Sequence, residues 1–537
     1  MQEISTDVLV VGGGLGGVAA AMAAARHGRR VLLTEETDWL GGQLTAQGVP
    51  PDEHPWIEQF GCTASYRSLR DGIRDFYRRW YPLTESARAD DRFNPGAATV
   101  SKLCSEPRVG VAVIEAMLAP HRSGDRLAIR YHTRPVGAET DGDRVTAVTL
   151  ADTRTDDRMV VQAAYVIDAT ETGELLPLTG TEYVTGFESR HDTGEPSAPD
   201  DHQPLNMQAA SICFAVEHRA GEDHTIDKPA HYDFWRNYQP AYWPGRQLGW
   251  VAPHPHTLAP HHHEFTPNPD EDPQSIVADQ SRNPGSTNLW LFRRIAARLN
   301  FRPGVLDSDI VLVNWPMIDY LEGPLFEVAD DEAARHLEGA RELSRSMLFW
   351  MQTEAPRPDG GAGFPGLRIR ADVMGTRDGL AKAPYHRESR RIKARFTITE
   401  QDLALRTRGD QGAVRYDDSV GVGMYRIDLH PSTGGDNYID VGSCPYQLPL
   451  GALLPRRMRN LLPACKNIGT THITNGAYRL HPTEWNIGEV AGLLAHHCLA
   501  EDTEPLALHE RDARLERFQQ LCDDQGVERA WPEVRGY

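Results

Sequence analysis

Two short apolar runs flank an alanine-rich segment at the start of the chain. Residues 7–11 form a brief apolar run bounded by polar and glycine residues, which predicts a buried β-strand. Residues 18–25 are apolar and mostly alanine, which predicts a helix that ends at Gly28. Residues 31–33 predict a second buried strand, which leads to Glu35. The beginning of the chain is therefore predicted to form a βαβ unit.

The turn between the first strand and the helix carries the pattern G-x-G-x-x-G at Gly12, Gly14 and Gly17. In this pattern the first glycine permits the tight turn, the second lets a pyrophosphate approach the backbone, and the third lets the helix lie close to the strand. The helix N-terminus offers free N–H groups to the phosphates, and the acid after the second strand accepts a ribose hydroxyl. The residues expected to contact a dinucleotide from this unit are Gly12, Gly13, Gly14, Leu15, Gly16, Gly17, Glu35 and Glu36.

The βαβ unit alone fits FAD or NAD, and the glycine-rich loop at residues 41–48 bears on that choice. The arrangement resembles the FAD-binding domain of glutathione-reductase-like flavoproteins, and specifically the large FAD-dependent oxidoreductase family, which is related to the fumarate reductase and succinate dehydrogenase flavoproteins. In that family the second glycine-rich segment wraps the pyrophosphate and approaches the flavin. The alternative is an ordinary strand-to-helix loop. The resemblance implies FAD contacts from Gly41, Gly42, Gln43 and Leu44.

The expected FAD is held non-covalently. Related succinate dehydrogenases carry an attaching histidine near the second glycine loop, and residues 40–48 contain none. Two later segments, at residues 135–136 and 166–173, resemble further FAD-contacting parts of the family. For the second segment, the alternative is a strand and turn without a special role. The two segments imply adenine contacts from Pro135 and Val136, and pyrophosphate contacts from Ala169, Thr170 and Gly173.

Near the end of the chain, residues 460–466 predict a short strand and residues 486–495 a helix. In the resembling family the N-terminus of this helix points at the flavin pyrimidine ring, where the helix dipole stabilises the anion formed on reduction. The implied FAD contacts are Trp485, Asn486, Ile487 and Gly488. Residues 470–485 are read as a loop that is dense in titratable groups beside the flavin.

That loop supplies the leading candidates for catalysis. His472 and His481 are the expected bases, because an imidazole accepts a proton near neutral pH, and Arg479 and Glu484 are expected to orient the substrate. The alternative is that these side chains only hold the loop and contact FAD.

Arg387 and Arg390 belong to a patch at residues 385–392 that also resembles the family. Closely spaced arginines often form ion pairs at a domain interface. The functional reading is that one of them grips an anionic or polar substrate group, or stabilises negative charge on the reduced flavin.

The predicted fold class is α/β, with a Rossmann-like FAD-binding domain of the glutathione-reductase type and a large inserted α+β substrate or cap domain. Composition changes in the middle of the chain, where proline, histidine and aromatic residues increase. The expected division is a discontinuous FAD-binding domain at 1–50, 100–178 and 440–500, a helical excursion at 51–99, a substrate or cap domain at 179–439, and a C-terminal helical tail at 501–537.

Composition limits which binding partners and which cellular compartment are expected for this protein. The net charge of -20 argues against nucleic acid or an anionic membrane as a partner, and a chain of 537 residues is too long for one core. No apolar run is long enough to span a membrane, and residues 1–6 lack the features of a signal peptide. The seven scattered cysteines contain no C-x-x-C pair and predict free thiols in a reducing cytoplasm. The preference for arginine is typical of a GC-rich bacterial source.

No metal is expected. Five histidines lie in a proline-rich stretch at residues 254–263, but no cysteine or carboxylate pattern completes a ligand set with sensible spacing, which favours a surface loop.

The resemblance implies an FAD-dependent oxidoreductase, a dehydrogenase or oxidase. A base would remove a proton from a small polar substrate, such as a natural-product or sugar-like intermediate, while hydride passes to flavin N5. Oxygen or another acceptor would reoxidise the flavin, and the oligomeric state is left open. One alternative is an FAD-dependent monooxygenase, although such hydroxylases usually place Gly-Asp before the final FAD helix and need an external reductant. A non-catalytic FAD-binding protein is the other alternative.

Overall fold

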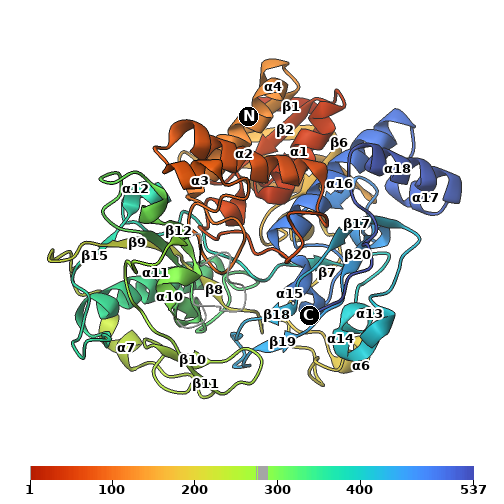
Figure 1. Cartoon of the computed structure of the whole chain (residues 1–537). Helices are drawn as coiled ribbons and strands as arrows, with labels where there is room; N and C mark the ends of the chain where they lie inside the picture. The colour runs from red at the N-terminus through yellow and green to blue at the C-terminus, as the bar shows by residue number, and fades with distance from the viewer. Residues whose placement is uncertain (1, 274, 276–287) are drawn as a thin grey trace.

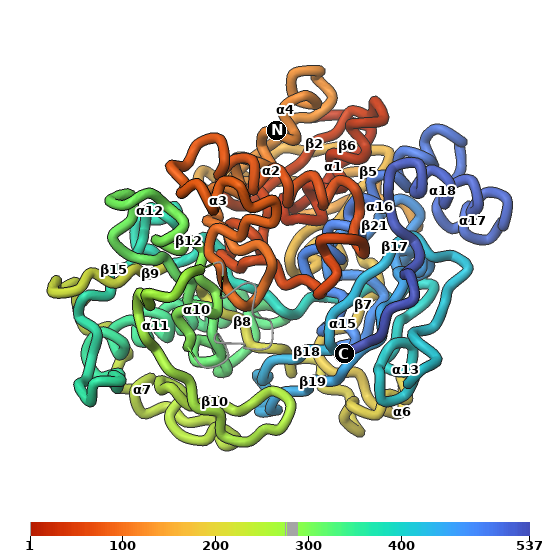
Figure 2. Tube along the Cα trace, viewed as in Figure 1, coloured from red at the N-terminus to blue at the C-terminus, as the bar shows by residue number. Residues whose placement is uncertain are grey.

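The computed structural model describes residues 2–273, 275 and 288–537 (Figures 1 and 2). Its first part is the predicted βαβ unit, formed by β1 (Gln2–Val11), α1 (Leu15–Arg26) and β2 (Val31–Thr34). The two strands pair in parallel, with Val8 opposite Val31. The predictions of two strands and a helix in this region are confirmed.

The main sheet has the strand order β3-β2-β1-β6, and β6 has different partners along its two halves. The parallel neighbours of β1 and β2 are β3 (Leu127–Arg130) and β6 (Arg158–Asp168), and the C-terminal half of β6 also pairs in parallel with β21 (Leu461–Pro463). The N-terminal half of β6 instead continues into an antiparallel meander with β5 (Arg144–Asp152) and β4 (Thr133–Asp141). The fold is α/β with a Rossmann-like FAD-binding sheet. A turn at Gly142, which has a φ of 57°, joins β4 and β5.

Three helices cover the sheet around α1. The final long helix, α16 (His481–Ala500), packs along α1, so that the two helices lie side by side in Figure 1. α4 (Pro107–Ser123) packs against α1 and β3, and α2 (Ala64–Trp80) packs against α4. The alanine side chains of α1 are almost all buried, which allows the neighbouring backbones to approach closely.

A second hydrophobic core lies in the middle of the chain. It is built on an antiparallel sheet in the order β12-β13-β9-β15. The long helix α11 (Asp330–Thr353) belongs to the same core and contacts β8, β14 and α7. The bounds of these strands and of α7 are β9 (Phe214–His218), β12 (Arg294–Ala296), β13 (Ile310–Val313), β15 (Leu367–Ile369), β8 (Ala210–Ser211), β14 (Asp319–Tyr320) and α7 (Tyr232–Asn237). The tryptophans of this core include Trp290, Trp315 and Trp350.

The other elements of the described residues are short. The helices are α3 (Glu85–Ala89), α5 (Leu175–Thr179), α6 (Arg190–Thr193), α10 (Leu289–Phe292), α12 (Ala371–Met374), α13 (Glu400–Leu403), α14 (Leu405–Arg408), α15 (His472–Tyr478), α17 (Pro505–His509) and α18 (Asp512–Asp524). The strands are β7 (Tyr183–Val184), β10 (Val251–Pro253), β11 (Pro260–His262), β16 (Arg391–Ile392), β17 (Ser419–Gly423), β18 (Ile427–Leu429), β19 (Ile439–Val441) and β20 (Tyr446–Pro449).

The prediction of a loop at residues 470–485 is wrong, because most of this segment is helical. α15 and the first turn of α16 occupy most of this segment, and α16 begins five residues before the predicted helix. The side chains of residues 470–485 are all buried, so the segment shows no alternation between a polar and an apolar face that would predict a helix. Within the part of the chain that the structure describes, no helix has the length and apolar character of a membrane span.

Gly488 tests the contact between α1 and α16, because a Cβ atom at this position would overlap the backbone of Gly16. We expect Gly488→Ala to lower the free energy of unfolding by about 1–3 kcal/mol, since the helices must separate to admit the methyl group. Urea unfolding followed by circular dichroism measures this change. Gly245→Ala is the matched control, because a Cβ atom there meets open space. Equal stability of the two variants would contradict the packing argument.

Candidate FAD site

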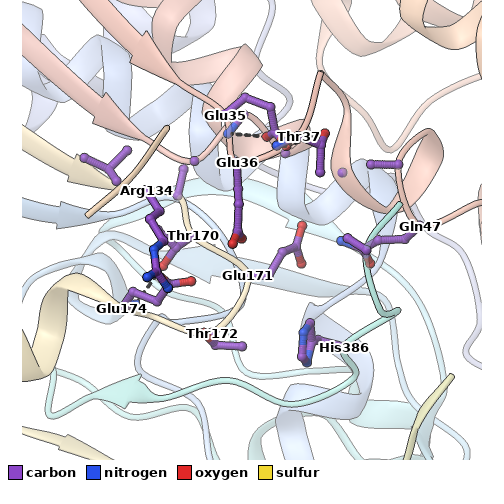
Figure 3. Close-up of a pocket in the computed structure, with 18 of the residues that line it drawn as sticks. Glu35, Glu36, Thr37, Gln47, Arg134, Thr170, Glu171, Thr172, Glu174 and His386 are labelled. Atoms are coloured by element: carbon purple, nitrogen blue, oxygen red, sulfur yellow. Dashed lines mark hydrogen bonds between the residues drawn. The ribbon is translucent and has the colours of Figure 1, made fainter. Parts of the chain in front are cut away.

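A cavity of about 210 Å³ lies at the carboxyl ends of β1, β2 and β6 (Figure 3). In open α/β sheets this is the edge at which ligands bind. Its lining comes from segments that are far apart in the sequence: Val11, Gly12, Gly13, Gly14, Glu35, Glu36, Thr37, Gly42, Ala46, Gln47, Thr133, Arg134, Pro135, Ala169, Thr170, Glu171, Thr172, Glu174, Leu325, Phe326, Ala383, Pro384 and His386.

The glycine turn presents bare backbone to the cavity. Gly12 has a φ of 102°, and a Cβ atom on it would overlap the backbone of Ala169. Gly14 is the N-cap of α1, and the atoms nearest to a Cβ atom there would be the carboxylate oxygens of Glu171 and Glu484, at 3.1 and 3.2 Å. The turn therefore brings bare backbone to the N-terminus of α1, where partial positive charge favours a phosphate. These residues fit the pyrophosphate of a dinucleotide.

The two acids after β2 have different surroundings. Glu35 accepts hydrogen bonds from the backbone N–H of Gly13 at 3.1 Å and from the Thr37 N–H and hydroxyl at 2.8 and 2.7 Å. Burial raises the pKa of Glu35 to about 7. Glu36 instead extends into the cavity in Figure 3, and its pKa is raised by burial and lowered by the charge of Arg134, with a net rise. Glu35 thus ties the glycine turn to β2, whereas Glu36 faces the open space.

The second glycine-rich loop is fastened to the first. The Gly41 N–H donates to Gly13 O at 2.8 Å, and Gly41 and Gly42 both have positive φ. Gly42 and Gln47 line the cavity, whereas Leu44 is buried in the main core. Gln43 donates from its side chain to Arg479 O at 3.1 Å and contacts the Glu484 carboxylate. The loop therefore connects the cavity to the start of α16.

A buried group of charged side chains lies beside the glycine turn. Glu484 Oε1 accepts the Gly16 N–H at 3.1 Å, and burial together with the charge of Glu171 raises the Glu484 pKa to about 7. Lys466 Nζ contacts the Glu171 carboxylate and lies 3.6 Å from Cys465 Sγ. Glu171, Cys465 and Glu484 bring potential ligand atoms within 4.8 Å of one another. Because the Lys466 ammonium already provides positive charge here, the geometry does not favour a metal ion.

Several residues expected to contact FAD are held inside the protein around the cavity. Trp485 donates from Nε1 to Ser65 Oγ at 2.7 Å, and Asn486 accepts the Val422 N–H at 3.3 Å. These contacts fix α16 in place. Of the residues expected from the strands, Pro135, Ala169 and Thr170 line the cavity. The predicted residues that the lining does not include are Leu15, Gly16, Gly17, Gly41, Gln43, Leu44, Val136, Gly173, Trp485, Asn486, Ile487 and Gly488.

The two histidines expected to act as bases do not line this cavity. His481 has both ring nitrogens occupied: Nδ1 accepts the Asp52 N–H at 3.2 Å, and Nε2 lies 3.1 Å from Val49 O. Burial lowers the His481 pKa to about 4, so the ring is neutral and anchors residues 49–52. The ring centroids of His472 and Phe187 lie 3.7 Å apart with the rings tilted by 35°, and His472 Nδ1 lies 2.8 Å from Glu388 Oε2.

The three candidate arginines are all paired with carboxylates. Arg387 Nη1 lies 3.1 Å from Asp319 Oδ1 and donates to Ala209 O at 2.8 Å. Arg390 donates to Glu327 at 2.6 Å and to Thr172 O at 2.9 Å. Arg479 donates to the Tyr385 hydroxyl at 2.7 Å and reaches Asp428 Oδ2 at 3.4 Å.

Sequence reasoning missed several residues that lie in or beside the cavity, among them His386, Gln47, Glu171 and Lys466. His386, Gln47 and Glu171 line it, and Lys466 reaches Glu171. Burial and the charge of Lys466 lower the His386 pKa to about 4. The 385–392 patch was the signal for His386, but its arginines are more numerous and direct attention away from the histidine.

A family model for FAD dependent oxidoreductases matches residues 7–521, so the chain belongs to this family and is an FAD-dependent enzyme. A 74-residue segment is 43% identical to the soluble pyridine nucleotide transhydrogenase of Hahella chejuensis, over 13% of this chain and 16% of that protein. An 80-residue segment is 34% identical to the FAD-dependent monooxygenase ntnJ of Nectria sp., over 14% and 19%. The chain thus matches less than a fifth of the length of either relative.

Among solved structures, p-nitrophenol 4-monooxygenase PnpA from Pseudomonas putida aligns with 98% of this chain and 89% of its own. The sequence identity is 11% and the TM-score 0.36. The family model, rather than this likeness, carries the assignment.

The raised pKa of Glu484 predicts a pH-dependent stability of the FAD-free protein. Between pH 4.5 and about 7 the folded protein retains a proton that the unfolded chain releases, so the free energy of unfolding falls as pH rises through this window. Above pH 7, the raised pKa of Glu484 lowers the free energy of unfolding by roughly 3 kcal/mol relative to its value below pH 4.5. In Glu484→Gln this contribution is absent, and we expect the variant to gain stability relative to the wild type as pH rises from 4.5 to 7.

Urea unfolding at a series of pH values measures this difference. The control is Glu338→Gln, which changes an exposed carboxylate on α11. If the Glu484→Gln and wild-type stabilities ran parallel over the whole range, the Glu484 carboxyl would titrate as it does in the unfolded chain.

Proposed function

We propose that this enzyme is a dehydrogenase or oxidase that moves a hydride from a small polar organic substrate to flavin N5. The observation that carries the proposal is that one cavity is lined both by the phosphate-binding glycine turn and by the titratable groups His386 and Glu171. A dinucleotide cofactor in this cavity would have its reactive end beside groups able to handle a proton.

Each end of the cavity suits a different part of FAD. Glu36, Thr37 and Arg134 suit the adenosine half, because the acid that follows β2 commonly accepts a ribose hydroxyl. Gly12 and Gly14 suit the pyrophosphate. The remaining lining, which includes Gln47, Pro384 and His386, is then left for the flavin half. When bound, FAD supplies a two-electron acceptor for hydride.

His386 is the proton acceptor that the geometry favours most. It lines the cavity, and its lowered pKa keeps the imidazole neutral at pH 7, so that a ring nitrogen can accept a proton, although as a weaker base than an ordinary histidine. His481 uses both ring nitrogens to hold residues 49–52, and His472 is paired with Glu388. Lys466, buried next to Glu171, supplies positive charge that would favour a negative charge developing nearby.

The remaining parts of the proposal concern the surroundings of the reaction. Oxygen or another small acceptor would reoxidise the flavin, and the substrate would be a small molecule rather than nucleic acid. The seven cysteines are free and buried, which supports a reducing, cytoplasmic setting. The preference for arginine over lysine supports a bacterial source.

Anaerobic mixing tests the reaction class. Substrate panels of alcohols, amines, sugars and hydroxy acids are mixed with the FAD-loaded enzyme, and bleaching of the flavin bands reports reduction. We expect reduction by substrate alone, without NADPH. Reduction only by NADPH, followed by oxygen consumption with substrate, would instead support a monooxygenase. Light-driven reduction with no response to any substrate would support a non-catalytic FAD-binding protein.

His386→Asn tests the assigned proton acceptor. We expect the rate of flavin reduction to fall roughly 10²- to 10⁴-fold, because a positioned base contributes an acceleration of that size. His509→Asn is the control, since His509 pairs with Asp418 near the surface and lies outside the cavity lining. A His386→Asn enzyme that reduces its flavin at the wild-type rate would contradict the assignment.

A further inference from the structure

A cluster of charged and phenolic side chains lies behind the second glycine loop and is not part of the cavity lining. It consists of Asp52, Arg293, Tyr385, Tyr425, Asp428 and Arg479, and we call it the Arg293 cluster. Arg293 Nη1 lies 3.6 Å from Asp52 Oδ1. On the other side, Arg479 donates to the Tyr385 hydroxyl and reaches Asp428. The charges of Tyr385 and Tyr425 are among the causes that raise the pKa of both arginines.

The Arg293 cluster adjoins the proposed flavin end of the cavity. Tyr385 stands in the chain between Pro384 and His386, which both line the cavity. Asp52 follows the loop that contains Gln47, and its N–H is held by His481. The side chain of Gln43 donates to the backbone oxygen of Arg479. The same loop therefore borders the cavity and the Arg293 cluster.

Polar atoms in the Arg293 cluster lack the partners that buried groups normally have. Among the described residues, Arg293 Nε and Nη1, Asp52 Oδ1 and Arg479 Nε are buried without a hydrogen bond. Asp52 is 5% exposed and Arg479 3%, and the Arg293 side chain is 11% exposed. Leaving a charged group in this state costs free energy, and the large majority of buried polar groups in native proteins are paired.

The neighbouring arginine shows what a structural arginine looks like in this protein. Arg294 is also buried, and it donates to Asp309 at 3.0 Å, to Gly96 O at 2.6 Å and to Ala97 O at 3.2 Å. All three of its nitrogens are used. Arg293 differs in having two nitrogens without a hydrogen bond, one of which lies 3.6 Å from a carboxylate oxygen of Asp52 that also makes none. This contrast suggests that a ligand completes the hydrogen bonding of Arg293.

The unpartnered atoms define the chemistry of that ligand. Guanidinium nitrogens only donate, so they require an acceptor, and the strongest is a carboxylate. Asp52 Oδ1 accepts, so the ligand must also carry a hydroxyl or amine. Because Arg293 Nη1 and Asp52 Oδ1 are 3.6 Å apart, the two ligand groups must sit close together on one molecule.

We propose that the Arg293 cluster is the substrate-recognition site of this enzyme and that it takes a small organic acid with a hydroxyl or amino group next to its carboxylate. Arg293 binds the carboxylate, and Asp52 accepts the hydrogen bond from the adjacent group. Arg479 and Tyr385, which are hydrogen-bonded to each other, form the opposite side of the site. His481 is a positioning residue, because it accepts a hydrogen bond from the backbone N–H of Asp52. This inference rests on the proposed function, for which it names the class of substrate.

Titration of the FAD-loaded enzyme with small acids tests the site. The probes are lactate and alanine, each compared with its neutral amide, lactamide and alaninamide, and the readout is the perturbation of the visible flavin spectrum. We expect at least one acid to bind at least 10-fold more tightly than its amide. The better of the two probes identifies whether the group beside the carboxylate is a hydroxyl or an amine. No perturbation by either acid, or equal binding of acid and amide, would overturn the proposal.

Variants of Arg293 connect this binding to the cluster. We expect Arg293→Gln to weaken binding of the preferred acid roughly 10- to 100-fold, which corresponds to loss of a hydrogen bond to a charged group. Arg293→Lys should recover part of the loss, because it restores charge without the planar guanidinium. Arg357→Gln, at an exposed ion pair with Asp359, is the control. FAD content establishes that each variant is folded. If Arg293→Gln fails to retain FAD, the comparison is made between Arg293→Lys and the wild type, and wild-type affinity in either Arg293 variant would overturn the proposal.

The two proposals fail in different ways. Reduction of the flavin by a neutral substrate, without any effect of the acids, would overturn the Arg293 cluster as the substrate site and leave the dehydrogenase or oxidase assignment in place. Binding of the acids without reduction of the flavin by any substrate would overturn the reaction class and leave the binding site in place.

Discussion

Close contact between backbones around the N-terminus of α1 is the constraint on which the rest of the structure depends. Gly12 packs against the backbone at Ala169, Gly16 against Ala464, and Gly488 against Gly16, so that a Cβ atom at any of these glycines would overlap a main-chain atom. β1, β6, β21 and α16 therefore meet around one helix N-terminus. Gly12 and Ala169 also line the cavity, so the contact between them sets both the packing of β1 and β6 and the shape of the candidate FAD site.

Charge around that floor is balanced by partners from distant parts of the chain. Glu484 accepts a backbone N–H from α1, and Lys466 pairs with Glu171 across the turn after β6. These groups keep carboxylates next to the proposed phosphate-binding turn, and burial together with the charge of Glu171 raises the Glu484 pKa to about 7. The fold thus places titratable groups in and beside the proposed FAD cavity.

The parts of the fold that the sequence predicts are those governed by local patterns. The apolar runs at 7–11 and 31–33, the glycine turn and the alanine-rich helix each require only neighbouring residues, and all are confirmed. α15 was missed because residues 472–478 are buried on every side, which removes the polar face that reveals a helix.

The site was harder to predict because its pairs are separated in sequence. Asp52 meets Arg293, and Tyr385 meets Arg479, only after the middle of the chain has folded against the FAD-binding sheet. His481 has the residue type of a catalytic base, but its ring is fully used by the backbone of residues 49–52. Residue type alone cannot separate such an anchor from a group that faces the cavity, as His386 does.

The central claim is that the cavity at the glycine turn holds FAD without a covalent bond. The most direct measurement is the absorption spectrum of the purified protein after reconstitution with FAD, repeated on the supernatant after acid precipitation. The account predicts flavin bands on the native protein that move entirely into the supernatant. Bands that stay with the precipitate would contradict non-covalent binding, and a protein that remains colourless after incubation with FAD would contradict the assignment of the cavity itself.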